Sequence, residues 1–303
     1  MAVKTEPVPS RNPNHPLVQP VFRFAPSPNG FLHLGHAYSA LLNAHLARET
    51  GGRFLVRIED IDTVRCTEAL IGACLEDLAW LGLGWETPVL RQSTQFGRYR
   101  ATADVLAARG LLYPCFCSRN DIAAAAGQMA ARDPDGAPVY PGTCRVLDAA
   151  KRAVRRASGE PFALRLDMAA ALAHIGARRF GWQEVSGERL EAVTDIETHP
   201  EKWGDVVLVR KETPTSYHLA VVLDDALQGI THVVRGTDLY EATAIHRVLQ
   251  MLLGLPEPRY HHHSLIRDAE GRKLAKSLAS TPLRQLRAEG VTAAQIRSRL
   301  GFD

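Results

Sequence analysis

Two histidines, His33 and His36, lie three residues apart where a predicted strand, Val21–Phe24, leads into a predicted helix, Leu34–Glu49. Residues at this spacing share one face of a helix. The unpaired N–H groups and positive dipole of a helix N-terminus favour phosphate, and Gly35 between the histidines lets a flat ring approach the backbone. Two imidazoles here could donate hydrogen bonds to charge that builds on a reacting phosphate. For this short pattern alone, two structural histidines at a helix cap are the simpler interpretation.

Two lysines, Lys273 and Lys276, lie in the segment Lys-Leu-Ala-Lys-Ser near the other end of the chain, after a predicted turn at 268–271. Cations at this spacing on a loop could neutralise a triphosphate from the side opposite the histidines. Taken alone, the segment is an ordinary exposed charged loop.

Together the two motifs carry more information than either does alone. Pro-Ser-Pro-Asn-Gly-Phe-Leu-His-Leu-Gly-His at 26–36 and the lysine segment at 273–277 resemble the two signature motifs of class I aminoacyl-tRNA synthetases. The lysine motif usually has Ser or Met where this chain has Ala275. The resemblance implies a Rossmann-like domain that activates an amino acid with ATP and Mg²⁺. It implies His33, His36 and Lys276 as catalytic residues and Pro26, Gly35, Lys273 and Ser277 as ATP-binding residues.

Further blocks resemble the glutamyl and glutaminyl branch of that class. They lie at 23–27, 57–62, 204–210, 217–225 and 229–238. By motif, the residues implied to surround a glutamate are Arg23, Phe24, Ala25, Ser27, Glu59, Tyr217 and Arg235.

The chemistry of an acidic amino acid agrees with this set. Arg23 and Arg235 can each offer a bidentate fork to a carboxylate. Glu59, after a predicted strand, can accept the ammonium, and Tyr217 offers a hydroxyl and a wall. For each residue the alternative is a surface ion pair of little energetic weight.

Two acidic pairs, Asp60 with Asp62 and Asp224 with Asp225, stand out near these blocks. A general acid/base dyad would need a buried cleft. We interpret Asp62, Asp224 and Asp225 as structural residues or as partners of the arginines. A role in binding Mg²⁺ stays open, because the ion usually accompanies ATP.

The 303-residue chain has only a short tail after Lys276, so we expect no anticodon-binding domain. This layout resembles the glutamyl-Q tRNA(Asp) synthetase family. That resemblance implies glutamyl-adenylate formation without tRNA, followed by transfer of glutamate to queuosine at the wobble position of tRNA(Asp). The alternatives are a 3′-end glutamyl-tRNA synthetase, a non-catalytic tRNA-binding paralogue and a nucleotidyltransferase of the same superfamily.

Basic residues could contact the phosphates of the tRNA anticodon arm. The candidates are the stretch 145–165 and the tail residues Arg284, Arg287, Arg297 and Arg299. A solvated charged face is an equally good interpretation of any one of them.

Three of the five cysteines, Cys115, Cys117 and Cys144, fall in an irregular segment. A closed structural zinc site usually has four ligands. The glutamyl-Q resemblance implies Tyr140 as the fourth, in Tyr-Pro-Gly-Thr-Cys, although the segment 118–139 is long. The alternative is free thiols without metal. Cys66 and Cys74 are expected in the core. In a strand, the three histidines at 261–263 cannot all face one ion, but one or two could face the ATP site.

The elements that must position these residues predict an α/β chain. A Rossmann-like catalytic domain is expected in two halves, 20–110 and 201–280, with a small zinc-binding, acceptor-type subdomain inserted at 111–200. A disordered leader is expected at 1–19 and a short helical tail at 281–303. Besides the two elements already named, we expect helices at 67–81, 96–108 and 239–253 and strands at 54–58, 205–210, 218–223 and 230–235.

Composition narrows the class of protein further. The net charge of +3 is too small for a protein that coats nucleic acid by charge alone. No apolar run approaches the length of a transmembrane helix. The N-terminal segment has no apolar stretch, so we expect it not to be a secretory signal. We therefore expect a cytoplasmic enzyme, acting as a monomer.

Overall fold

The computed structural model describes residues 19–127, 131–177, 179–265 and 281–302. The expected leader, apart from Gln19, lies outside this part of the chain. So do Lys273, Lys276 and Ser277, together with the turn expected before them.

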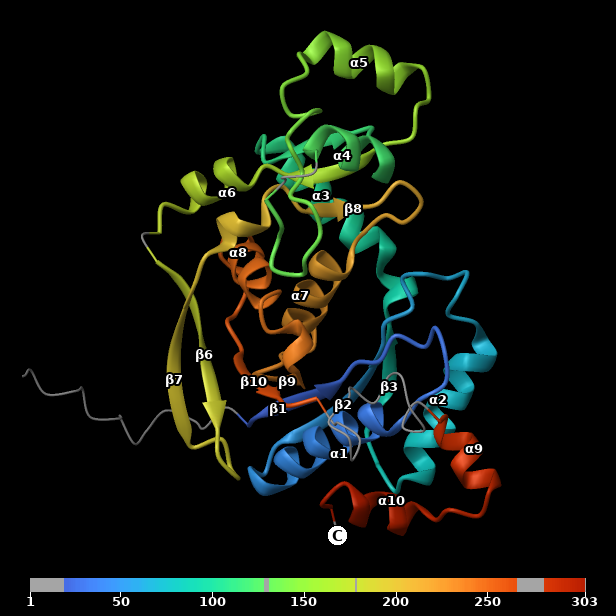
Figure 1. Cartoon of the computed structure of the whole chain (residues 1–303). Coiled ribbons are helices and arrows are strands. Elements are labelled where there is room, and N and C mark those ends of the chain that lie inside the picture. The colour runs from blue at the N-terminus through green and yellow to red at the C-terminus, as the bar shows by residue number, and fades with distance from the viewer. Residues whose placement is uncertain (1–18, 128–130, 178, 266–280, 303) are drawn as a thin grey trace, which may run out of the picture.

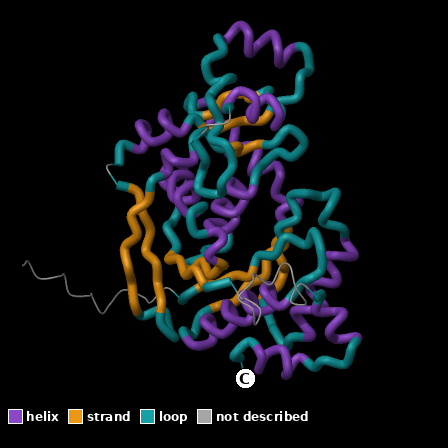
Figure 2. Tube along the Cα trace, in the orientation of Figure 1, coloured by secondary structure: helices purple, strands orange, loops and turns teal. Residues whose placement is uncertain are grey.

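A seven-stranded sheet forms the base of the molecule, with the order β3-β2-β1-β9-β10-β6-β7. All neighbouring strands are parallel except β6 and β7, which pair antiparallel. In Figure 2 its orange strands cross the middle of the molecule and end in the long β6–β7 hairpin. The strands are β1 (Val21–Phe24), β2 (Arg53–Ile58), β3 (Glu86–Arg91), β6 (Phe180–Ser186), β7 (Ala192–Thr198), β9 (His232–Gly236) and β10 (Arg259–His263).

Helices cover both faces of this sheet, as expected of a doubly wound fold. Figure 1 shows α1, α9 and α10 below the sheet and α7 and α8 above it. A core that joins β1 and β2 to α1 and α2 also includes Leu283 and Ile296 from the tail. The helices are α1 (Leu34–Glu49), α2 (Glu68–Trp80), α7 (Tyr217–Leu227), α8 (Thr243–Leu253), α9 (Leu283–Ala288) and α10 (Ala293–Arg299).

A smaller antiparallel sheet, in the order β4-β5-β8, lies above α7 and α8 in Figure 1. Its strands are β4 (Leu112–Cys115), β5 (Ala163–Leu166) and β8 (Val207–Val209). The helices around it are α3 (Phe96–Ala108), α4 (Arg119–Ala126), α5 (Ala149–Ala157) and α6 (Met168–Ile175), and 3₁₀ turns occupy Gln92–Gln95, Pro200–Trp203 and Thr237–Leu239.

The two sheets do not follow the expected boundaries at 111 and 200. β6 and β7 lie inside that range but extend the larger sheet, whereas β8 lies outside it and pairs with β5. The domain division therefore stays a prediction.

One expected element is wrong: the segment 218–223 is not a strand but part of helix α7. Every side chain from Leu219 to Asp225 is buried, so the segment lacks the alternation of a half-exposed helix. A short continuous apolar run fits a buried strand and a buried helix equally well. By contrast, α1 has the predicted bounds, and Cys66 and Cys74 are buried as expected.

Among the helices of the described residues, none has both the length and the apolar character needed to cross a membrane.

Gly181 in β6 gives the first testable prediction. A Cβ there would overlap the carbonyl oxygen of Ile196 in β7. Gly181→Ala should lower the free energy of unfolding by about 1–3 kcal/mol, the usual cost of overpacking, as measured by urea denaturation. The matched control is Gly72→Ala, at an exposed position in α2 with nothing within 4 Å. It should stabilise the protein by up to about 1 kcal/mol. Equal effects of the two substitutions would contradict the close approach of β7 to Gly181.

Candidate active site

A cavity of about 620 Å³ opens at the carboxyl edge of the larger sheet, where β1, β2 and β9 end beside the first turn of α1. Ligands bind at this edge in open α/β folds. The structure brings the described candidates together here. Those lining the cavity are Arg23, Phe24, Ala25, Pro26, Ser27, His33, Gly35, His36, Glu59, Tyr217 and Arg235. Sequence reasoning did not find Ser39, Asp238 and Leu239, which also line it.

His33 and His36 do cap α1, as the simpler interpretation of their motif holds. The Nδ1 atom of His33 accepts a hydrogen bond from the Gly35 N–H at 3.1 Å, and that of His36 accepts from the His33 N–H at 3.2 Å. A Cβ on Gly35 would lie only 3.0 Å from the His33 ring. Because both Nδ1 atoms are acceptors, both neutral rings carry their proton on Nε2. Capping therefore leaves two Nε2–H donors for a ligand.

Both rings are neutral near neutral pH. Burial lowers the pKa of His33 below its ordinary value of 6.5. Burial, with a contribution from His33, lowers the pKa of His36 to about 4. The pair can therefore stabilise phosphate charge by hydrogen bonding while carrying no net charge of its own.

A buried ion network lies beneath the cavity. The side chain of Arg57 in β2 has no exposed surface and donates to Asp225 at 2.7 Å and to Glu59 at 3.0 Å. Arg23 in β1 donates to the same Asp225 at 3.0 Å. Burial disfavours each charge, but the two arginines outweigh it and lower the pKa of Asp225. The network fixes both Arg23 and Glu59 at the cavity wall.

In this network the charged form of Glu59 is less favoured than the charged form of Asp225. Burial raises its pKa, although Arg57 and Arg23 oppose that effect. A cationic group bound in the cavity would favour the charged form of Glu59, which suits it to accept an ammonium.

Arg235 in β9 already has an acceptor for each of its five N–H groups. The acceptors are His262 Nε2, Tyr217 Oη, His246 Nδ1, the Leu239 carbonyl and Thr243 Oγ1. A substrate carboxylate can thus form the expected fork with Arg235 only by replacing some of them. Tyr217 accepts from Arg235 and lines the cavity, so its own O–H remains free to donate to a carboxylate.

The acidic pairs are partners of arginines, as expected. Asp225 forms ion pairs with Arg23 and Arg57, and Asp62 forms an ion pair with Arg65. The other two carboxylates hold the structure around the site. Asp60 accepts from Arg91 and from Ser93, and Asp224 accepts from Arg98, Tyr99 and Gln92.

The three histidines of β10 face different ways, as their position in a strand predicts. His261 contacts the Val185 carbonyl oxygen, and His262 bridges Glu184 and Arg235. Only His263 of the three lines the cavity. Its Nδ1 bonds to the Ser264 carbonyl, so Nε2 is an acceptor, and it is buried without a partner in the described part of the chain.

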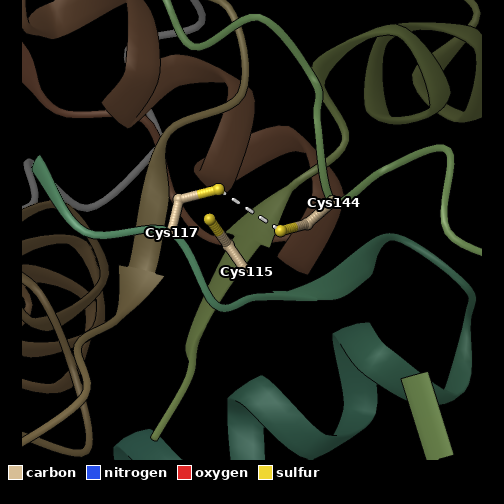
Figure 3. A group of neighbouring side chains, drawn as sticks. All are labelled: Cys115, Cys117 and Cys144. Carbon is tan, nitrogen blue, oxygen red and sulfur yellow. Dashed lines mark hydrogen bonds between the residues drawn. The ribbon is translucent and has the colours of Figure 1, made fainter. Parts of the chain in front are cut away.

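The three cysteines converge, as Figure 3 shows. Their Sγ atoms lie within 4.8 Å of one another. The Cys117 Sγ atom is 3.5 Å from that of Cys144 and 3.6 Å from the Tyr140 hydroxyl oxygen. Zinc–sulfur bonds of about 2.3 Å in a tetrahedron put sulfurs about 3.8 Å apart. The donor set therefore fits one zinc ion. Burial raises the pKa of the Tyr140 hydroxyl, so its oxygen would need a bound cation to act as a phenolate.

Many of the basic candidates already have structural contacts. Arg155 pairs with Glu160, Arg145 pairs with Asp205, and Arg165 lies over the Tyr140 ring. In the tail, Arg297 donates to the Leu81 carbonyl, Arg284 lies over Phe31, and Arg287 lies over Trp80.

The geometry can be compared with known proteins. The model of the family of class I tRNA synthetases (E and Q), catalytic domain, matches residues 20–300, almost the whole chain. The chain belongs to this family. Membership implies ATP with Mg²⁺, an amino acid and tRNA as ligands. It also accounts for a cavity that combines a histidine-capped helix with arginines and a carboxylate.

Two curated relatives of this chain carry names that state different activities. The glutamyl-Q tRNA(Asp) synthetase of Rhodobacter capsulatus is 49% identical over 289 residues, covering 93% of this chain and 100% of that protein. Glutamate–tRNA ligase 2 of Methylobacterium radiotolerans is 39% identical, and the match covers 91% of this chain but 58% of that protein.

Solved structures agree on the class I fold. Glutamate-tRNA synthetase from Elizabethkingia anophelis superimposes with a TM-score of 0.69 at 25% identity over 84% of this chain. The chain spans about half the length of that protein, 52%. Methionyl-tRNA synthetase of Mycobacterium tuberculosis, with a TM-score of 0.55 at 15% identity, shares the fold alone.

The buried network gives the second prediction. Asp225→Asn leaves Arg57 buried without its main partner, and such a change costs about 3–5 kcal/mol of unfolding free energy. Because the folded protein lowers the pKa of Asp225 below its ordinary 3.8, this contribution is complete at neutral pH. It is lost as pH falls below that value. Urea unfolding of both proteins at neutral and acidic pH measures the difference.

The control for this substitution is Asp104→Asn, at an exposed position in α3, which should change stability by less than about 0.5 kcal/mol. A difference between wild type and Asp225→Asn that stays constant into acid would contradict the assigned role of Asp225.

Proposed function

We propose that this protein activates L-glutamate with ATP and transfers the glutamyl group to queuosine at the wobble position of tRNA(Asp). One observation carries the proposal: a single cavity combines two Nε2–H donors at a helix N-terminus with Arg23, Glu59 and Tyr217. This arrangement suits a polyphosphate beside a dicarboxylic amino acid.

In the first step, the α-carboxylate of glutamate attacks the α-phosphorus of ATP in line, and pyrophosphate leaves. The chain contributes mainly position and charge stabilisation. His33 and His36 donate to the phosphate oxygens, and the proposal assigns Lys276 to the same charge from the other side. Pro26, Gly35, Lys273 and Ser277 complete the ATP site in this proposal. Mg²⁺ would neutralise the phosphates of bound ATP.

The glutamate is held by groups of both signs. Arg23 and the Tyr217 hydroxyl, itself bonded to Arg235, suit its carboxylates, while Glu59 suits its ammonium. Phe24, Ala25 and Ser27 form the remaining wall. The unpaired His263 Nε2 offers an acceptor for a hydroxyl or amino group of the nucleotide.

In the second step, a hydroxyl of the cyclopentene diol of queuosine attacks the activated carbonyl. The ester C–O bond forms, the mixed anhydride breaks, and AMP leaves. The phosphate of the leaving AMP can take the hydroxyl proton. The name of the Rhodobacter capsulatus relative, matched over its whole length, supports this acceptor. We further propose that the enzyme acts as a cytoplasmic monomer.

A 3′-end glutamyl-tRNA synthetase is the second candidate, favoured by the match to glutamate–tRNA ligase 2. The two functions share the first step and differ only in the acceptor. An experiment must therefore separate the acceptors.

The third prediction concerns the acceptor. Labelled glutamate, ATP and Mg²⁺ are incubated with bulk tRNA from cells that make queuosine and from cells that cannot. We expect label only on the queuosine-containing pool, since only that pool offers the diol. Equal labelling of both pools would contradict the proposal and favour 3′-end charging.

Pyrophosphate exchange without tRNA controls for the first step. His36→Ala should reduce exchange by about 10²–10³-fold, the usual effect of removing one preorganised donor. The exposed Asp104→Asn variant should exchange at the wild-type rate.

We also propose that Cys115, Cys117, Cys144 and Tyr140 hold one structural zinc ion. Support comes from the spacing of their ligand atoms and from their burial beside β4. The ion would fix the irregular segment after β4 to the smaller sheet. That sheet, with α4 and α5, would face the RNA as an inserted subdomain.

The fourth prediction follows from this site. Elemental analysis of the purified protein should find one zinc per chain, and Cys117→Ser should lose most of it. Substituting Cys74, a buried thiol in α2, with Ala should leave the zinc content unchanged. Full zinc content in Cys117→Ser would contradict the proposed ligand set.

A further inference from the structure

A second cavity, of about 520 Å³, adjoins the active site. Tyr217 forms part of the wall of both cavities, so the two cavities adjoin at this residue. The second cavity lies between α7 and the loop 131–139, the green segment that extends toward α7 after α4 in Figure 1. Flat side chains of Tyr140, Trp203 and His218 line it.

At the inner end of this cavity, formed by Ser216 and His218, the His218 ring offers a hydrogen-bond donor whose tautomer follows from its neighbours. A guanidinium can only donate, so Arg235 makes Nδ1 of His246 an acceptor. The proton of neutral His246 then lies on Nε2, which donates to Nδ1 of His218 at 3.3 Å. His218 therefore carries its own proton on Nε2, in a ring that lines the cavity. Burial and Arg235 lower the pKa of His218 to about 4, so this donor is neutral.

Ser216 adds an unused hydroxyl beside that donor. It is the N-cap residue of α7, a position where a serine hydroxyl usually bonds to a helix N–H. Here no such bond forms, and Ser216 Oγ is buried without a hydrogen-bond partner among the described residues. Only 4% of Ser216 is exposed, and it lines the cavity. A buried unpaired hydroxyl is costly unless a ligand bonds to it.

The outer end is acidic and well ordered by its own hydrogen bonds. Asp133 accepts from the Ala137 N–H at 2.8 Å, and the Val139 N–H donates to the Ala131 carbonyl at 2.9 Å. Val139 packs where a Cβ on Gly204 would lie, 2.6 Å from it, so this glycine lets the loop approach closely. The loop thereby holds the carboxylates of Asp133 and Asp135 at the cavity wall.

These carboxylates have no ion pair within the described ranges. Partial loss of hydration and the carboxylates of Asp133, Glu241 and Asp238 raise the pKa of Asp135. Asp238 itself lines the active-site cavity. Cations also line the second cavity: Arg165 donates to the Asp205 carbonyl, while Arg119 and Arg210 are exposed. The lining of the cavity thus offers charged groups of both signs.

We propose that this second cavity binds the acceptor nucleoside. Ser216 and His218 hold its hydroxyl groups beside the glutamyl group, and Asp133 and Asp135 bind its cationic secondary amine. The inference rests on the proposed function, since it needs a base that carries both a diol and an amine. Arg119 and Arg210 are then available for the flanking phosphates.

The test of the acidic wall uses anticodon stem-loops of tRNA(Asp) that differ only at the wobble base. One carries guanine, one carries 7-aminomethyl-7-deazaguanine, which has the amine without the diol, and one carries queuosine. Wild type should bind the aminomethyl stem-loop about tenfold more tightly than the guanine stem-loop, a gain of about 1.4 kcal/mol. Asp135→Asn should lose most of this preference, while pyrophosphate exchange stays at the wild-type rate.

Asp104→Asn is the matched control, because it removes the same charge from an exposed position outside the cavity. It should keep the full preference. A preference that is absent in wild type, or unchanged in Asp135→Asn, would overturn the assigned role of the acidic wall.

Ser216→Ala tests the inner end, and it removes no helix-capping bond. It should reduce the rate of glutamate transfer to the queuosine stem-loop at least tenfold, with binding of the aminomethyl stem-loop unchanged. Wild-type transfer by this variant would overturn the assignment of Ser216. Failure of wild type to transfer glutamate to the queuosine stem-loop at all, with labelling at a tRNA 3′ end instead, would overturn the proposed function itself.

Discussion

The buried guanidinium of Arg57 is the constraint on which the active site depends. A cation without exposed surface is costly unless carboxylates lie beside it and accept its hydrogen bonds. Asp225 and Glu59 supply the carboxylates and Gln228 a further acceptor, so that only Nε of the Arg57 guanidinium lacks a partner among the described residues. Asp225 also binds Arg23. Arg23 and Glu59, which line the active-site cavity, are therefore held by the same buried charges. Changing one of them alters the electrostatic balance of all four.

The parallel sheet makes this network possible. Arg23 and Asp225 are 202 positions apart in the chain, yet β1, β2 and the helix α7 bring them into contact. Strands that run in one direction present their carboxyl ends at one edge, where the N-terminus of α1 also lies. The same edge therefore combines the histidine-capped helix end with the charged groups that we propose to bind the amino acid.

Much of this could be predicted from the sequence because it depends on local signals. The bounds of α1 follow from helical spacing and from Gly51 and Gly52, and those motif residues that the structure describes line one cavity. The strand expected at 218–223 was wrong because a buried helix has no exposed face to mark its period.

The partners of Arg235 could not be predicted either. They come from α7, α8, β10 and the turn at Thr237–Leu239, and no local pattern records such a meeting. Their number matters chemically, because a guanidinium with five acceptors binds a substrate only by exchange. The sequence gives the charge of such a residue, but it does not show how many of its N–H groups already have an acceptor within the protein.

Arg235 also links the two cavities in a fixed direction. It donates to Tyr217, which lines both, and through His246 it sets the tautomer of His218 in the second. A guanidinium does not accept hydrogen bonds or lose its proton in proteins. The series of hydrogen bonds from Arg235 through His246 to His218 therefore cannot reverse its donor direction and cannot relay a proton. It acts as a positioning device. A ligand that keeps the bonds from Arg235 to Tyr217 and to His246 therefore leaves the donors of the second cavity in place.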